Sequence, residues 1–161
     1  MWQNLIDTII ELMEMYNCLF ILNEKKRKAV LDIDMSALNK IVETEQELTG
    51  SVIKAEQKRQ KILKQMAAEN SGINENSNAK TLLAFCPQTY KESFSKANND
   101  LSANVEKVSS INETNRLLLQ GALTAVNMNI NSLAGIKADP GYEKSGNQNF
   151  SSQKKKFDFQ A

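Results

Sequence analysis

The strongest constraint on this chain is a spacing of three and four residues between apolar positions, kept through three long stretches. This spacing places apolar side chains on one face of an α-helix. Two prolines and six glycines among 161 residues leave few sites for the tight turns of a many-stranded sheet. The sequence therefore predicts an all-α protein. The first stretch shows the pattern at Trp2, Leu5, Ile9, Leu12, Tyr16 and Leu19.

Capping and breaking residues set the expected bounds of the helices. Asp34, or alternatively Ser36, is a suitable N-cap for the second helix, and Asn78 is one for a short third helix. Pro87 disfavours a helical conformation at Cys86 and fits the start of a new helix. The resulting helices span about 2–31, 35–69, 79–85 and 88–136.

The connection over residues 32–36 is short, which makes the first two helices antiparallel. We predict an elongated antiparallel hairpin or bundle of three long helices plus a short one. One helical domain is expected over residues 1–136. Residues 137–161 follow as a flexible tail that is disordered by composition, because Asp139-Pro140-Gly141 ends the helical pattern.

Two charged residues, Glu45 and Arg59, stand on the otherwise apolar face of the second helix. In one interpretation they extend toward solvent or pair with the first helix. In the other they fix the register of the hairpin, as polar seam residues do in coiled coils. The sequence leaves both open.

Composition argues against an enzyme and against a nucleic-acid-binding protein. Twenty basic and 19 acidic side chains give a formal charge of +1, and histidine, the commonest general base and metal ligand, is absent. No phosphate-binding or nucleophile motif occurs. Cys18 and Cys86 form no CxxC pair, and we expect each to be a small buried hydrophobe. We therefore predict no catalytic residues, no metal site and no cofactor.

The residues from Leu117 to Ile136 contain no charged side chain, over about the length that crosses a bilayer. Gln120 and the asparagines at 127, 129 and 131 would leave unmet hydrogen bonds in lipid. We therefore expect no stable membrane insertion. The last helix is longer than the first two, so its far part either bends near Gly121 or projects beyond the helices that could cover it. Its apolar stripe would then be available to an amphipathic partner helix.

The first 16 residues contain three carboxylates and no Lys or Arg, so the basic start of a secretion signal is missing. We expect a cytoplasmic protein.

The order of long helix, short corner, long helix, polar linker, short helix, very long helix and loose tail resembles the FlgN-like flagellar export chaperones. In the first two helices the likeness rests on Leu5-Ile6, Leu12-Met13, Leu19, Leu22, Asp34, Leu38, Ile41-Val42, Glu45 and Leu48. In the last helix and after it, it rests on Ile111-Asn112-Glu113-Thr114-Asn115-Arg116-Leu117-Leu118-Leu119, Leu133 and Pro140-Gly141-Tyr142-Glu143-Lys144-Ser145-Gly146.

The resemblance implies a cytoplasmic chaperone of the flagellar type III secretion pathway. Such proteins bind hook-filament junction proteins, keep their carboxy-terminal helices from assembling early, and pass them to the export apparatus, without a cofactor. The family binds cargo through the end of the last helix and the segment after it. By position, this implies partner-binding residues at Leu118, Leu119, Ala122, Val126, Ile130, Leu133, Ile136 and Tyr142.

Three other interpretations stay open. The chain fits a structural coiled-coil adaptor that builds a permanent complex and has no export role. The apolar residues of the last helix equally fit a bundle core or a homodimer seam. Finally, Lys154-Lys155-Lys156, with Phe157 and Phe159 close by in sequence, fits a contact with a membrane surface, RNA or an acidic partner.

Overall fold

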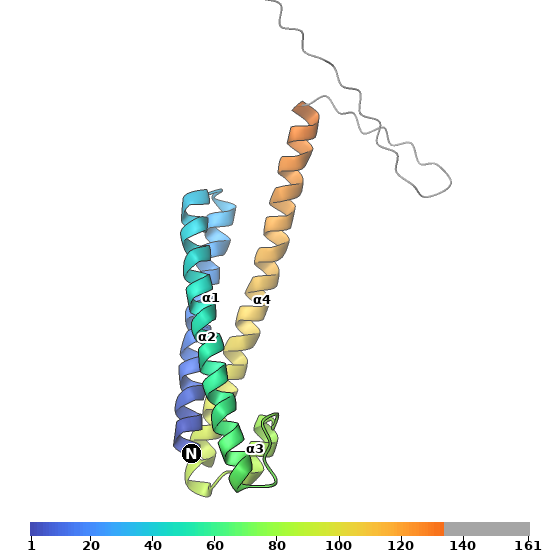
Figure 1. Ribbon diagram of the computed structural model, residues 1–161. Helices are drawn as coiled ribbons and strands as arrows, with labels where there is room; N and C mark the ends of the chain where they lie inside the picture. Colours follow the sequence, from blue (N-terminus) through green and yellow to red (C-terminus); the bar gives the residue numbers. More distant parts are fainter. Residues whose placement is uncertain (134–161) are drawn as a thin grey trace, which may run out of the picture. The chain divides into compact units, whose positions relative to one another are not determined.

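The computed structural model describes residues 1–133 and consists there of four helices without a strand (Figure 1). They are α1 (Trp2–Leu31), α2 (Met35–Glu69), α3 (Ala79–Phe85) and α4 (Gln88–Leu133). The predicted all-α fold is confirmed. The bounds of the first three helices coincide with the predicted ranges, and α4 continues through Gly121 as one helix. The predicted tail over 137–161 lies outside the described residues.

Residues Met1–Leu118 form one compact unit, and the residues from Leu119 onward belong to a second unit that is treated by itself below. In the first unit, α1 and α2 lie side by side and antiparallel (Figure 1). The wide apolar face of α1 contacts both α2 and α4. Near its start, Trp2 meets Phe94 of α4 edge to face, with 5.6 Å between the ring centroids.

The buried side chains form two clusters along this unit. The first joins the start of α1 to the end of α2, α3 and the start of α4, and Leu5, Leu63 and Phe94 are at most 1% exposed there. The second, further along α1, contains Leu12, Leu19, Val52, Ala55 and Val108. Leu101 of α4 is half-buried and packs against both clusters.

The linker between α2 and α3 is fixed by its own side chains. Asn70 Oδ1 accepts from the Gly72 amide at 3.0 Å, and Asn78 Oδ1 caps α3 by accepting from the Thr81 amide at 2.8 Å. Ile73, an isolated apolar residue in this polar segment, is buried in the first cluster. The linker is therefore held to the core although its composition is that of a loop.

On α4 the apolar spacing alone does not identify every buried position. Val105 follows Leu101 by four residues but is exposed, whereas Asn104 is half-buried and donates to the Met13 backbone oxygen at 3.2 Å. The buried face keeps a seven-residue repeat through Phe94, Leu101 and Val108, and Asn104 falls on it between Ala97 and Ile111. The apolar periodicity identifies the buried face of α4 approximately. It does not identify Asn104 as part of that face, because this side chain is polar.

The corner between α1 and α2 is a Schellman motif with an unusual residue. The Asp34 amide donates to the Ala29 oxygen at 2.9 Å and the Ile33 amide donates to the Val30 oxygen at 3.3 Å. Ile33 has φ of 55°, in the left-handed region that glycine normally occupies in this motif. Asp34 then caps α2, as predicted, by accepting from the Ala37 amide at 2.9 Å.

We predict that Ile33→Gly stabilises the protein. The left-handed conformation costs a β-branched residue about 1–2 kcal/mol, and the side chain is 80% exposed, so little packing is lost. We expect a gain of about 1 kcal/mol in the free energy of unfolding, measured by urea titration with circular dichroism. Ile53→Gly, at an exposed position inside α2, is the matched control and should instead lose about 1 kcal/mol. A loss at both positions would contradict the strain.

The two cysteines differ in environment. Cys86 is buried, as predicted, and burial raises the pKa of its thiol. The expectation that Cys18 is buried was wrong, because this residue is exposed. It precedes Leu19 on α1 and falls outside the apolar columns, so its apolar neighbours in sequence are not neighbours in space.

We predict that a thiol reagent labels Cys18 at least about tenfold faster than Cys86 in the native protein, because only an exposed thiol ionises and reacts readily. The rates are measured by absorbance at neutral pH, with Cys18→Ser and Cys86→Ser assigning the two phases. In denaturant the two labelling rates should become similar. Equal labelling rates already in the folded protein would contradict the buried position of Cys86.

Candidate partner-binding surface

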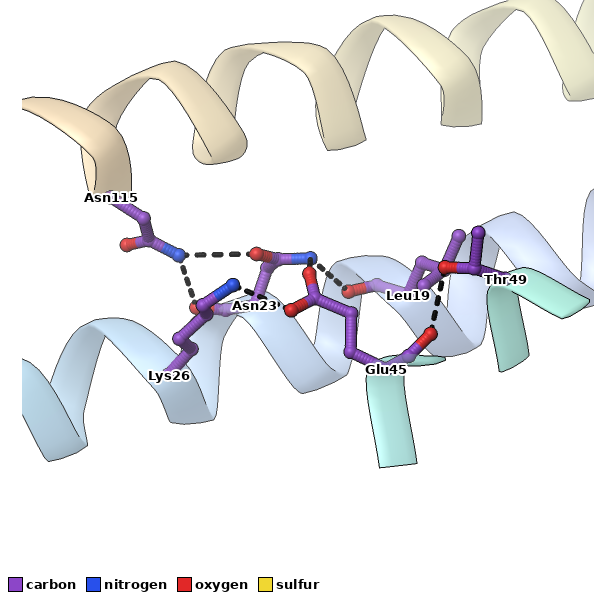
Figure 2. Close-up of polar contacts among 6 residues, drawn as sticks. All are labelled: Leu19, Asn23, Lys26, Glu45, Thr49 and Asn115. Carbon is purple, nitrogen blue, oxygen red and sulfur yellow. Dashed lines mark hydrogen bonds and ion pairs between the residues drawn. The ribbon is translucent and has the colours of Figure 1, made fainter. Parts of the chain in front are cut away.

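A polar layer, buried at Asn23 and Asn115 and half-buried at Lys26 and Glu45, joins α1, α2 and α4 (Figure 2). Asn115 of α4 donates from Nδ2 to the backbone oxygen of Asn23 at 2.9 Å and to its Oδ1 at 3.2 Å. Asn23 Nδ2 donates to the Leu19 oxygen at 2.9 Å and to Glu45 Oε1 at 3.3 Å. Lys26 Nζ pairs with the other oxygen of Glu45 at 2.5 Å. One contact chain therefore crosses all three long helices.

The contacts of Glu45 and Arg59 can now be compared with the two interpretations of these seam residues. Glu45 pairs with α1, as one interpretation expected. Arg59 pairs within its own helix instead, because its Nε donates to Glu56 of α2 at 2.8 Å. That the layer sets the hairpin register stays a prediction, supported by the burial of Asn23 at 0% exposure.

Asn115 is the last buried residue of α4 among those that the structure describes. Its Oδ1 has no hydrogen-bond partner there, while its Nδ2 satisfies Asn23. An amide in this position ties one helix to another by donation alone. A buried acceptor such as Asn23 Oδ1 depends on that donor, since an unmet polar group in the interior costs about 1–3 kcal/mol.

We predict that Asn115→Ala lowers the free energy of unfolding by about 1–3 kcal/mol, because Asn23 Oδ1 loses its donor. Asn112→Ala is the matched control: it lies three residues earlier on α4 and is exposed, so its effect should stay within about 0.5 kcal/mol. Urea unfolding of both variants measures the difference. Similar effects at the two positions would show that the polar layer carries no stability.

The last two charged residues of α4 form an ion pair with each other. Arg116 binds Glu113 at 2.8 and 2.7 Å, and this hydrogen bond lowers the pKa of Glu113 and raises that of Arg116. From Leu117 to the described end of α4 no side chain is charged. The helix thus changes from a charged to an uncharged surface within one turn.

Beyond this pair α4 carries an exposed apolar stripe, which we call the α4 stripe. Its members follow three- and four-residue steps and so share one face of the helix. Leu123 is 62% exposed, Val126 52% and Ile130 56%. Apolar side chains gathered on one exposed face mark an interaction surface. The stripe comprises Leu119, Ala122, Leu123, Val126 and Ile130.

Other exposed residues of this segment lie off the stripe. At 100° per residue, Leu117 and Met128 fall on the opposite face, and both are exposed. The asparagines at 127, 129 and 131 are exposed as well. Together with Gln120 they carry the side-chain amides of α4 between residues 117 and 133. The stripe is therefore bordered by uncharged polar groups.

The structure places the predicted partner-binding residues unequally. Leu119, Ala122, Val126 and Ile130 are exposed together on the stripe, whereas Leu118 is half-buried. Leu133 is the last described residue of α4, and Ile136 and Tyr142 lie outside the described residues. Sequence reasoning missed Leu123, although its position four residues after Leu119 and three before Val126 would have identified it.

The first unit also contains an open groove of about 420 Å³ between α1 and α4. Phe20 and Ile111 contribute apolar surface to it, and charged side chains of both signs border it. Within the described residues no cluster of three or more Cys, Asp or Glu is placed to hold a metal ion. No helix in the same part of the chain is long and apolar enough to cross a membrane.

An exposed apolar helix face on a helical protein is typical of proteins that bind a partner helix. The sequence matches the family described as FlgN protein over residues 1–149, which is most of the chain. The chain belongs to the FlgN family. Members of this family are chaperones and not enzymes, and membership gives this chain the general role of a flagellar export chaperone that binds flagellar proteins. No curated protein and no solved structure matches it.

Proposed function

We propose that this protein is a cytoplasmic export chaperone for the hook-filament junction proteins of the flagellum. It binds their helical carboxy-terminal region, prevents premature assembly, and delivers them to the type III export apparatus. The observation that carries the proposal is the α4 stripe, an exposed apolar face on an uncharged helix end in a member of the FlgN family. Membership in the FlgN family supports the general chaperone role, and the α4 stripe is the surface that we propose contacts the cargo.

The chemistry of the stripe favours a helical occupant. Apolar residues at three- and four-residue steps match the apolar face of a second helix, which buries both. Ala122, a small residue, lies on the stripe, so a partner backbone can approach closely there. The neighbouring asparagines can bond polar groups at the edge of such a contact. Full burial of Leu123, Val126 or Ile130 contributes about 1.5–3 kcal/mol each before the cost of association.

The remaining contacts of the proposal lie at both ends of the stripe. Leu118 precedes it and Leu133 follows it on α4, and Ile136 and Tyr142 continue the segment in sequence. Occupation of this surface by cargo keeps two apolar helices out of water at once. The same occupation denies the cargo its own assembly contacts, which is what a chaperone of an assembling protein requires.

We predict that Leu123→Asp combined with Val126→Asp abolishes capture of the junction proteins in a pull-down with purified cargo. Each carboxylate would have to be buried against an apolar helix, which costs far more than the lost contact. Leu117→Asp combined with Met128→Asp is the matched control, since these residues are equally exposed on the opposite face. That double variant should retain the cargo.

Two measurements separate the alternatives. Light scattering of the free protein tests whether the stripe is a homodimer seam, in which case Leu123→Asp with Val126→Asp would convert a dimer to a monomer. Fractionation of assembled filaments tests the adaptor interpretation, because a chaperone stays behind whereas an adaptor remains with the assembly. Retention of cargo by the stripe variant, with loss in the control, would overturn the proposed contact.

A further inference from the structure

The corner between α1 and α2 exposes large apolar side chains that neither the core nor the α4 stripe uses. Leu31 is 59% exposed, Ile33 80% and Met35 60%. We call residues 31–35 the hairpin tip. Single exposed apolar residues are ordinary, but three within five positions at the end of a hairpin form a patch.

The backbone of the tip gives a second, independent observation. The Schellman motif needs a left-handed residue at position 33, and glycine would meet that need without strain. The chain instead holds a β-branched residue there and extends its side chain into water. Folding explains neither the strain nor the exposure. A strained residue with an exposed side chain indicates a function outside the fold.

Basic residues surround the tip. Residues 25–40 contain five basic and two acidic side chains. Lys26 is paired with Glu45, and Asp34 is engaged as the cap of α2. We call the four exposed cations the basic ring: Lys25, Arg27, Lys28 and Lys40.

The basic ring lies at a definite depth behind the tip. On α1 its members precede Leu31 by three to six residues, which is about 4.5–9 Å along the helix axis. On α2, Lys40 follows Met35 by five residues, or about 7.5 Å. Apolar groups of surface-bound helices enter the headgroup region of a bilayer by about 5–10 Å. The spacing therefore places cations at the level of lipid phosphates when the apolar tip is immersed.

We propose that the hairpin tip docks on an anionic lipid surface, with its apolar side chains among the headgroups and the basic ring against the phosphates. The five basic side chains of residues 25–40 outnumber Asp32 and Asp34, the two carboxylates of the tip, and the resulting net charge of +3 is complementary to such a surface. A convex apolar tip suits a fluid that closes around it, whereas a protein partner would need a matching cleft. This contact goes beyond the proposed function and does not depend on it.

The test is cosedimentation of the full-length protein with vesicles of phosphatidylethanolamine and phosphatidylglycerol, and with vesicles of phosphatidylcholine alone. We expect binding to the anionic vesicles that weakens with salt, and none to the neutral ones. Ile33→Asp should weaken binding by about tenfold or more. Lys25→Glu with Arg27→Glu should weaken it at least about 25-fold, because each surface cation contributes about fivefold.

Matched controls use the same hairpin away from the tip. Ile53→Asp, and Lys54→Glu with Lys61→Glu, change exposed residues on α2 and should bind like the unaltered protein. Ile33→Gly separates binding from folding, because it relieves the strained backbone while removing the apolar side chain. We expect this variant to unfold at higher urea yet bind the vesicles about tenfold more weakly.

Several outcomes would overturn the proposal. One is failure of the unaltered protein to bind anionic vesicles, which would make the tip a contact for protein. Another is unchanged binding of the Ile33→Asp variant. A third is loss of binding when Lys154, Lys155 and Lys156 are all changed to Gln while the tip variants still bind. Cargo capture is measured in parallel, and Ile33→Asp should leave it intact, so the two proposals fail separately.

Discussion

The bundle depends on the width of the apolar face of α1. A single column would bury this helix against α2 alone, and α4 would then have no apolar surface to meet. Neighbouring columns at Leu5, Ile6 and Ile9 instead bury the helix on two sides, and the contact of Trp2 with Phe94 ties its first turn to α4. Hairpin, linker, α3 and α4 all converge on this helix.

The polar layer gives the bundle a second kind of order. Apolar columns alone allow helices to slide by one repeat, since leucine packs on leucine in either register. Asn23 bonds both Asn115 of α4 and Glu45 of α2, and a shift of either helix by one repeat would separate these partners, so we predict that the layer fixes the register. The layer stands at the end of the buried part of α4, so the described core ends at a polar contact and not at an apolar one.

Most of the fold was predictable because its signals are local. Asp34 and Asn78 cap the helices that follow them, and periodicity identified the buried faces. The burial of Cys18 was predicted wrongly because burial depends on contacts between helices that a sequence pattern does not specify. The φ of Ile33 was hidden for another reason, since its residue type argues against it. Of the candidate surface, the helix and its three- and four-residue spacing were predictable, whereas the exposure of each residue depends on which neighbouring helices reach it.

The uncharged character of the helix end has a kinetic consequence. Between Arg116 and Lys137 the chain presents no charge that could draw a partner in from a distance. Encounters at this surface would proceed at the unsteered rate, about 10⁵–10⁶ M⁻¹s⁻¹, and ionic strength would hardly alter them. Differences among ligands would then arise in how long each one stays, which is set by the fit of side chains. A surface of this kind ranks its ligands by residence time.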